Sequence, residues 1–177
     1  MGKMSEALID CGSLQFGEFT LASGDKSSYY IDIKKASTNP KVLKIIAVLM
    51  AEEVLKLDQV PDRIAGVVLG SVPLAAALSL ETGIPYVMIR KEKKDHGTGK
   101  LIEGELNDGD RVLVVEDVIT TAGSSMNAIR TIREAGGKVT DVFSVIDRQV
   151  GGSENLSSIG VRLHPLVTAS ELLEGHK

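Results

Sequence analysis

The fold of this protein is decided by the segment Val112-Leu113-Val114-Val115-Glu116-Asp117-Val118-Ile119-Thr120-Thr121-Ala122-Gly123-Ser124-Ser125. A continuous apolar run opens the segment, two carboxylates follow it, and hydroxyl residues with a glycine lead into helical spacing over 126–135. Apolar runs this short, bounded by polar residues, are typical of strands that are buried on both faces. The segment therefore predicts a buried strand over 111–115, a polar loop and a helix in direct succession.

The remainder of the chain repeats this alternation of short strands and helices. Further core strands are expected at 64–69, 86–90 and 139–146. Helices are expected at 5–10, 42–57 and 73–80, and Thr168 with Glu171 predicts a capping box for a last short helix. Two more strands, around 19–21 and 29–33, flank a turn near the amino terminus. The alternation predicts an α/β fold with a mostly parallel central sheet flanked by helices.

Composition restricts the class of protein. The chain has 177 residues, of which 43% are hydrophobic, so we expect one domain with a substantial core. Its net charge of −4 gives no overall attraction to nucleic acid, and no apolar run approaches the ~20 residues of a membrane span. With a single cysteine, Cys11, and no signal peptide, the sequence fits a cytoplasmic protein without disulfides.

The loop that follows residue 115 has the chemistry of a phosphate site. Ligands of parallel sheets bind beyond the carboxyl ends of the strands, and helix N-termini attract phosphate through free N–H groups. Thr and Ser hydroxyls add donors, Gly123 permits close approach, and Glu116 with Asp117 can accept hydrogen bonds from the hydroxyls of a sugar. An ordinary strand-to-helix turn with capping hydroxyls is the alternative. The paired acids favour a phosphorylated sugar.

Cationic side chains follow two other strands. Five of them occur within 90–100: Arg90, Lys91, Lys93, Lys94 and Lys100. Glycines at 97 and 99 suit a lid that closes over an anion such as pyrophosphate, although a solvated loop is the alternative. Arg148, after the strand at 139–146, has the forked geometry that binds a carboxylate, with a surface ion pair as the alternative.

These residues carry a resemblance to a known family. Residues 112–124 resemble the phosphoribosyl pyrophosphate (PRPP) signature of the type I phosphoribosyltransferases. The loop with Arg90, Lys91, Lys94, His96 and Gly97 resembles the flexible catalytic loop of the orotate phosphoribosyltransferase family. Residues 12–24 and 27–32 resemble the hood that covers the base in that family, and the resemblance as a whole extends from about 12 to 173.

The resemblance implies transfer of the 5-phosphoribosyl group from PRPP to orotate, which gives orotidine 5′-monophosphate and pyrophosphate in pyrimidine biosynthesis. It implies a single domain over 1–177, with a hood from about 1–35 plus a C-terminal segment and a core at about 40–150. Mg²⁺ would be held through PRPP, with no protein metal ligand. The molecule would be a homodimer whose basic loop is shared between subunits.

The resemblance also assigns roles to individual residues. Glu116 and Asp117 would hold the ribose 2′- and 3′-hydroxyls, and the loop after them would hold the 5′-phosphate. The implied PRPP-binding residues are Glu116, Asp117, Val118, Ile119, Thr120, Thr121, Ala122, Gly123 and Ser124. The implied pyrophosphate contacts are Arg90, Lys91, Lys94 and His96. Thr120 and Arg148 would bind orotate.

Two departures from the family pattern concern lysines. Ala22 stands where many members have lysine, and Lys26 lies close enough in sequence to substitute for it. The loop Gly70-Ser71-Val72-Pro73 also lacks a lysine, so it would bind pyrophosphate through backbone amides, unless Ser71 and Pro73 only begin a helix. Two other functions remain open: a purine or uracil phosphoribosyltransferase, in which Arg148 has no role, and a non-catalytic PRPP-sensing regulator that binds nucleic acid.

Overall fold

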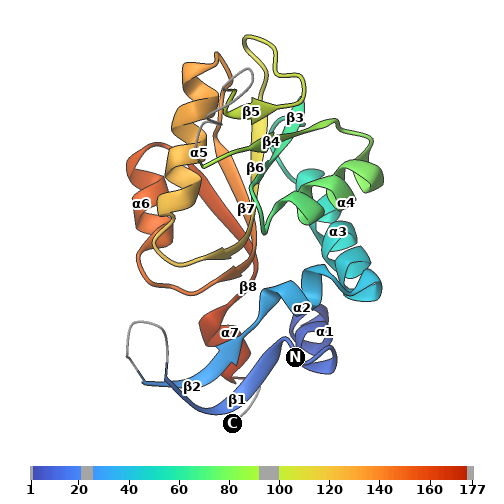
Figure 1. Cartoon of the computed structure of the whole chain (residues 1–177), viewed down its shortest axis with the longest axis vertical. Helices are drawn as coiled ribbons and strands as arrows, with labels where there is room; N and C mark the ends of the chain where they lie inside the picture. The colour runs from blue at the N-terminus through green and yellow to red at the C-terminus, as the bar shows by residue number, and fades with distance from the viewer. Residues whose placement is uncertain (1, 21–25, 92–99, 175–177) are drawn as a thin grey trace.

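A mostly parallel sheet forms the centre of the molecule (Figure 1). The computed structural model describes residues 2–20, 26–91 and 100–174. The sheet has six strands in the order β5-β4-β3-β6-β7-β8, with the edge strand β5 antiparallel to β4 and the others parallel. They are β3 (Arg63–Val67), β4 (Tyr86–Ile89), β5 (Ile102–Glu103), β6 (Val112–Ile119), β7 (Asp141–Asp147) and β8 (Arg162–Thr168). The predicted α/β class is confirmed.

Helices cover both faces of the sheet. One face carries α1 (Lys3–Asp10), α3 (Pro40–Val54) and α4 (Val72–Thr82), and the other carries α5 (Gly123–Glu134) and α6 (Gly152–Ser158) (Figure 1). Alternate residues of β6 serve the two faces: Leu113 and Val115 join the first apolar cluster, Val112 and Val114 the second. Because helices cover both faces, the central strands are mostly apolar, which is the pattern that predicts them. None of the helices in the described part of the chain combines the length and the apolar character that crossing a bilayer requires.

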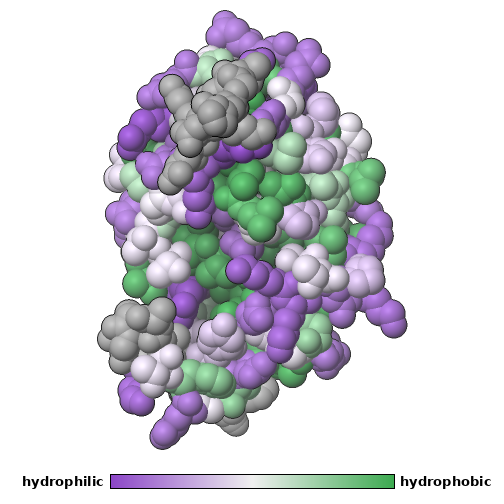
Figure 2. All heavy atoms as spheres, viewed as in Figure 1, coloured by the Kyte–Doolittle hydropathy of each residue, from purple (hydrophilic) through white to green (hydrophobic). Residues whose placement is uncertain are grey.

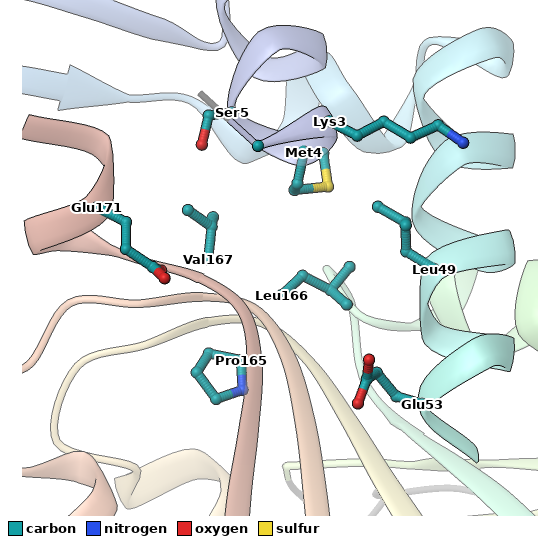
Figure 3. Close-up of a pocket in the computed structure, with 10 residues that line it drawn as sticks. Lys3, Met4, Ser5, Leu49, Glu53, Pro165, Leu166, Val167 and Glu171 are labelled. Atoms are coloured by element: carbon teal, nitrogen blue, oxygen red, sulfur yellow. The ribbon is translucent and has the colours of Figure 1, made fainter. Parts of the chain in front are cut away.

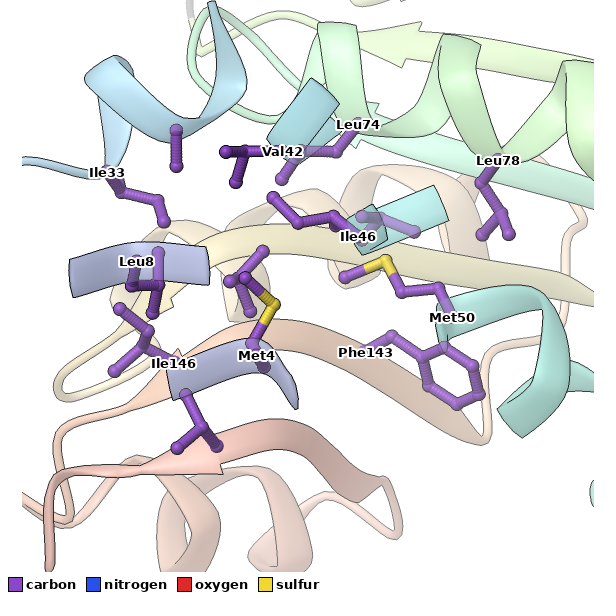
Figure 4. Packing of buried hydrophobic residues seen from close by; sticks show 14 of the residues in the cluster. Met4, Leu8, Ile33, Val42, Ile46, Met50, Leu74, Leu78, Phe143 and Ile146 are labelled. Atoms are coloured by element: carbon purple, nitrogen blue, oxygen red, sulfur yellow. The ribbon is translucent and has the colours of Figure 1, made fainter. Parts of the chain in front are cut away.

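The amino-terminal segment shares its core with the sheet. Figure 4 shows Met4 and Leu8 of α1 packed with Ile46 of α3 and with Phe143 and Ile146 of β7. All five side chains are at most 3% exposed. Burying such side chains contributes roughly 1.5–3 kcal/mol each, so α1 is held firmly against the sheet.

A small hairpin lies apart from the sheet and forms the predicted hood. It consists of β1 (Leu14–Thr20) and β2 (Lys26–Ile31), which pair antiparallel, and lies close to α2 (Ile33–Ser37) and α7 (Ala169–Glu174) (Figure 1). The expected strand over 29–33 thus ends earlier, because Asp32 caps α2 through its Oδ1, which accepts from Lys34 N at 3.2 Å. The capping box before α7 is confirmed by Thr168 N donating to Glu171 Oε2 at 2.7 Å.

Other differences from the predicted elements lie around the loops. β6 continues to Ile119, which pairs with Asp147 of β7, so the acid pair is inside the strand rather than after it. α5 begins at Gly123 instead of 126. β8 is not predicted from the sequence, because polar residues and a proline interrupt it, which an edge strand tolerates. The sheet therefore extends beyond residue 150, where the core was expected to end.

Candidate functional site

The order of the strands places a pocket between β3 and β6. The chain leaves β3 towards β4 on one side and later returns to β6 on the other side, so the strand order reverses at this pair. Such reversal points open a crevice at the carboxyl ends of the strands. A pocket of about 500 Å³ lies there, lined by the loop 67–71, by the end of β6 and by residues of α2. In Figure 2, apolar atoms gather at the centre of this face, and hydrophilic atoms lie below them towards α2.

Glu116 is buried beside this pocket and bonded to protein hydroxyls. Ser71 Oγ donates to its Oε2 at 2.5 Å, and Ser125 Oγ donates to its Oε1 at 3.0 Å. The residue is 6% exposed, and burial raises the pKa of Glu116 to about 7, against the lowering effect of both hydrogen bonds. Glu116 therefore accepts hydrogen bonds from hydroxyl groups, as expected, but these hydroxyls belong to two serines of the protein and not to a sugar.

Asp117 also lies against the loop that precedes α4. Neighbouring residues of a strand point to opposite faces, so Asp117 meets this loop at Gly70, whereas Glu116 bonds to Ser71 of the loop and to Ser125 of α5. Asp117 is half-buried and lies against Gly70, where a Cβ would come within 2.4 Å of Asp117 Oδ2. Its Oδ1 accepts from Val118 N at 2.8 Å. Both carboxylates therefore border the pocket from within β6 rather than from a loop after it.

The residues after Asp117 contribute chiefly backbone to the site. Ile119 and Ala122 are buried in the apolar core, whereas Thr120, Thr121, Gly123 and Ser124 are exposed where α5 begins. Of these, Ser124 lines the pocket, as does Val118. Ala122 has a φ of 63°, and its left-handed conformation turns the chain into α5. The N–H groups of the first turn are thus presented at this end of the sheet.

Arg148 follows β7 and reaches the hood. Its backbone N donates to Ile119 O at 2.9 Å, which keeps it beside Thr120. Its guanidinium lies over the ring of Tyr29 in β2, 5.8 Å from the ring centroid. Arg148 Nε is buried, and no hydrogen-bond partner for it exists among the described residues. The structure therefore places the guanidinium of Arg148 where the hood meets the sheet, with its Nε–H free to donate to a ligand.

The cationic residues after β4 are separated by the fold. Lys91 lines the pocket, and its charge acts on Glu116. Arg90 Nε instead donates to Glu103 Oε1 of β5 at 3.0 Å. Lys94 and His96 lie outside the described residues, as does Ala22. Lys26 donates to Thr20 Oγ1 at 2.9 Å within the hairpin, so in this structure its amine is used inside the hood.

Sequence reasoning missed one wall of the pocket. Lys34, Ser37 and Thr38, from α2 and the residue after it, line the pocket opposite the loop 67–71. The available signal was Asp32 followed by two lysines, which is a capping residue before a short cationic helix. Only tertiary packing brings Lys34 to this pocket.

A second cavity lies away from this site. It has a volume of about 290 Å³ and lies between α1, α3, β8 and α7 (Figure 3). Met4, Leu49 and Leu166 line it, together with Glu171 of the capping box. No residue of the segment 116–124 borders this cavity, so it is not the candidate site.

Substituting Glu116 by glutamine is expected to remove a pH-dependent loss of stability. The unfolded side chain ionises near its ordinary pKa of 4.5, whereas the folded one, with a pKa of about 7, retains its proton. Its stabilising contribution is complete below pH 4.5 and is lost as the pH rises to about 7, a change on the order of 3 kcal/mol. Glu116→Gln should therefore gain stability relative to the native protein between about pH 5 and about pH 8.

Urea unfolding across that pH range measures the difference. The exposed Glu154, substituted by glutamine, controls for the loss of a carboxylate elsewhere on the surface. Parallel stability profiles for the native protein and Glu116→Gln would contradict the expectation.

Comparison with known proteins agrees with this geometry. Residues 33–159 match the family model described as "Phosphoribosyl transferase domain". An orotate phosphoribosyltransferase of Pyrococcus abyssi is 52% identical over 172 residues, which cover 97% of this chain and 94% of that protein. The crystal structure of orotate phosphoribosyltransferase from Aeropyrum pernix aligns with a TM-score of 0.85 at 33% identity and covers 97% of both chains.

A ligand-bound structure is also similar. The orotate phosphoribosyltransferase of Mycobacterium tuberculosis H37Rv in complex with PRPP aligns with a TM-score of 0.79 at 31% identity, over 97% of this chain and 99% of that one. Sequence and fold thus agree over nearly the whole chain. This protein belongs to the orotate phosphoribosyltransferase family of type I phosphoribosyltransferases.

Proposed function

We propose that this protein transfers the 5-phosphoribosyl group from PRPP to orotate, giving orotidine 5′-monophosphate and pyrophosphate for pyrimidine biosynthesis. The carrying observation is the pocket between β3 and β6, where the acid pair, the start of α5 and the loop 67–71 meet. Arg148, beside the same end of β6, supplies the group that a planar carboxylate requires.

PRPP is held by the segment 116–124 and by the loop after β3. The 5′-phosphate lies at the start of α5, where the backbone N–H groups and the hydroxyls of Thr120, Thr121 and Ser124 are donors. Asp117 accepts a hydrogen bond from a ribose hydroxyl. Glu116 belongs to the same binding segment, but in the ligand-free geometry its oxygens are occupied by serines.

The reaction needs alignment and electrostatic stabilisation rather than a nucleophilic side chain. Displacement at the anomeric carbon leaves positive charge on the ribose and gathers negative charge on pyrophosphate. Lys91 at the pocket, with Lys94, His96 and Arg90 of the same loop, neutralises the leaving group. Arg90 first has to leave Glu103, with which it forms a half-buried ion pair.

Magnesium accompanies PRPP and is held mainly by substrate oxygens. The donor set fits this arrangement: Asp117 offers the pocket a half-buried carboxylate, while both oxygens of Glu116 accept from serines. When bound, Mg²⁺ would neutralise charge on the pyrophosphate group. Asp117 would lie beside it at the pocket without being its main ligand.

Orotate binds between the sheet and the hood. Arg148 pairs with the orotate carboxylate, Thr120 donates to the base, and Tyr29 supports the guanidinium from below. We also propose that the protein works in the cytoplasm as a homodimer and that part of the basic loop serves the neighbouring subunit's site. The reducing cytoplasm suits the free thiol of Cys11.

The test is a spectrophotometric assay of orotate consumption with PRPP and Mg²⁺. Orotate should be consumed and pyrophosphate released in equal amounts, while adenine, guanine, hypoxanthine and uracil are inactive. Turnover of a purine or uracil in place of orotate would assign the other phosphoribosyltransferase activity. Binding of PRPP with no turnover on any base, together with a gel shift of nucleic acid, would assign the regulator.

A further inference from the structure

One buried carboxyl group joins three segments of the site. Ser71, at the end of the loop after β3, and Ser125, in the first turn of α5, are each 1% exposed. Their hydroxyls donate to the two oxygens of Glu116 in β6. The loop, the strand and the helix therefore meet at a single side chain.

We propose that Glu116 is a positioning residue that holds the loop 68–71 in the shape that receives pyrophosphate. The inference rests on the proposed function. Although Ser71 occupies the helix N-cap position of α4, its hydroxyl makes no capping hydrogen bond and is directed to Glu116 instead. The Ser71 side chain therefore attaches the loop to β6 and does not cap α4.

The loop needs such support because its backbone supplies the donors. It contains no lysine, and among the described residues the N–H groups of Leu69 and Gly70 have no hydrogen-bond partner. Both residues line the pocket. Backbone donors bind an anion well only when they are fixed in advance, since otherwise binding must include the cost of ordering them.

Asp117 fixes the same loop in a different way. It lies against the Cα of Gly70, where no Cβ could fit, but it makes no hydrogen bond to Ser71 among the contacts of the described residues. The loop is thus packed against one acid and hydrogen-bonded to the other. Only the bond through Glu116 extends to α5, so a change at Ser125 can reach the loop through Glu116.

The experiment is calorimetric titration of inorganic pyrophosphate, with Mg²⁺, into the full-length protein and its variants. Glu116→Ala and Ser125→Ala should each weaken pyrophosphate binding on the order of ten-fold, the value of about one buried hydrogen bond. Glu116→Gln should stay within about two-fold of the native protein, because the amide can bond both serines. Ser153→Ala, an exposed serine of α6, is the control.

The direction of the change separates this role from a simple charge effect. If Glu116 acted on pyrophosphate only through a negative charge, its removal would tighten pyrophosphate binding in every Glu116 variant. Unchanged or tighter binding in both Glu116→Ala and Ser125→Ala, or no binding by the native protein, would overturn the proposal. If Glu116→Ala does not fold by circular dichroism, Ser125→Ala decides. Orotate turnover by the native protein is measured separately, so its absence refutes the proposed function and not this inference.

Discussion

Replacement of Arg148 by leucine is expected to reduce kcat/KM for orotate on the order of 10²–10³-fold. The guanidinium stands over Tyr29 with its Nε buried and, among the described residues, unbonded. A bound carboxylate would satisfy this fork, and truncating one partner of a buried charged pair costs roughly 3–4 kcal/mol. Steady-state kinetics with orotate varied at saturating PRPP measure the loss.

The affinity for PRPP distinguishes a local effect from a general one. Calorimetry should find it within about two-fold of the native value in Arg148→Leu, because the proposed phosphate donors lie at the start of α5. Arg130→Leu, which removes an exposed arginine from α5, should leave orotate kinetics unchanged. Equal losses for PRPP and orotate in Arg148→Leu would refute a role in base recognition.

Replacement of Phe143 by alanine is expected to lower the free energy of unfolding by roughly 3–5 kcal/mol. Phe143 of β7 is 1% exposed and belongs to the apolar cluster of Figure 4, with Met50 and Ile46. Its ring meets the ring of His164 edge-on, with 5.1 Å between the two ring centroids. Close-packed neighbours on a sheet move little, so the substitution leaves a cavity. Urea unfolding gives the free energy, and the melting temperature should fall by about 10 °C.

An exposed apolar residue provides the matched control. Leu55, after α3, is 81% exposed, and Leu55→Ala should change the free energy of unfolding by less than about 0.5 kcal/mol. A loss below about 1 kcal/mol in Phe143→Ala would show that the core around β7 rearranges to fill the space.

Local sequence patterns predict the inner strands of the sheet well, but they miss the edge strand β8 and the full length of β6. The strands at 64–69, 86–90 and 139–146 are recognisable because each is mostly apolar and much of each is buried. β8 escapes the same rule, since an edge strand with His164 and Pro165 has fewer apolar positions. The acid pair does line the pocket beside β6, but the extent of β6 depends on pairing with β7, which no local pattern contains.

The sequence by itself determined the α/β class and the resemblance to the family, and it singled out the segment 116–124, because these depend on residues adjacent in the chain. Tertiary structure decided which side chains meet. It turned Glu116 towards Ser71 and Ser125, set Arg148 on Tyr29, and placed Lys34 on the wall of the pocket. Contacts between residues 9 to 119 positions apart arise from strand order and from the alternation of side chains across a sheet, and both exist only once the chain has folded.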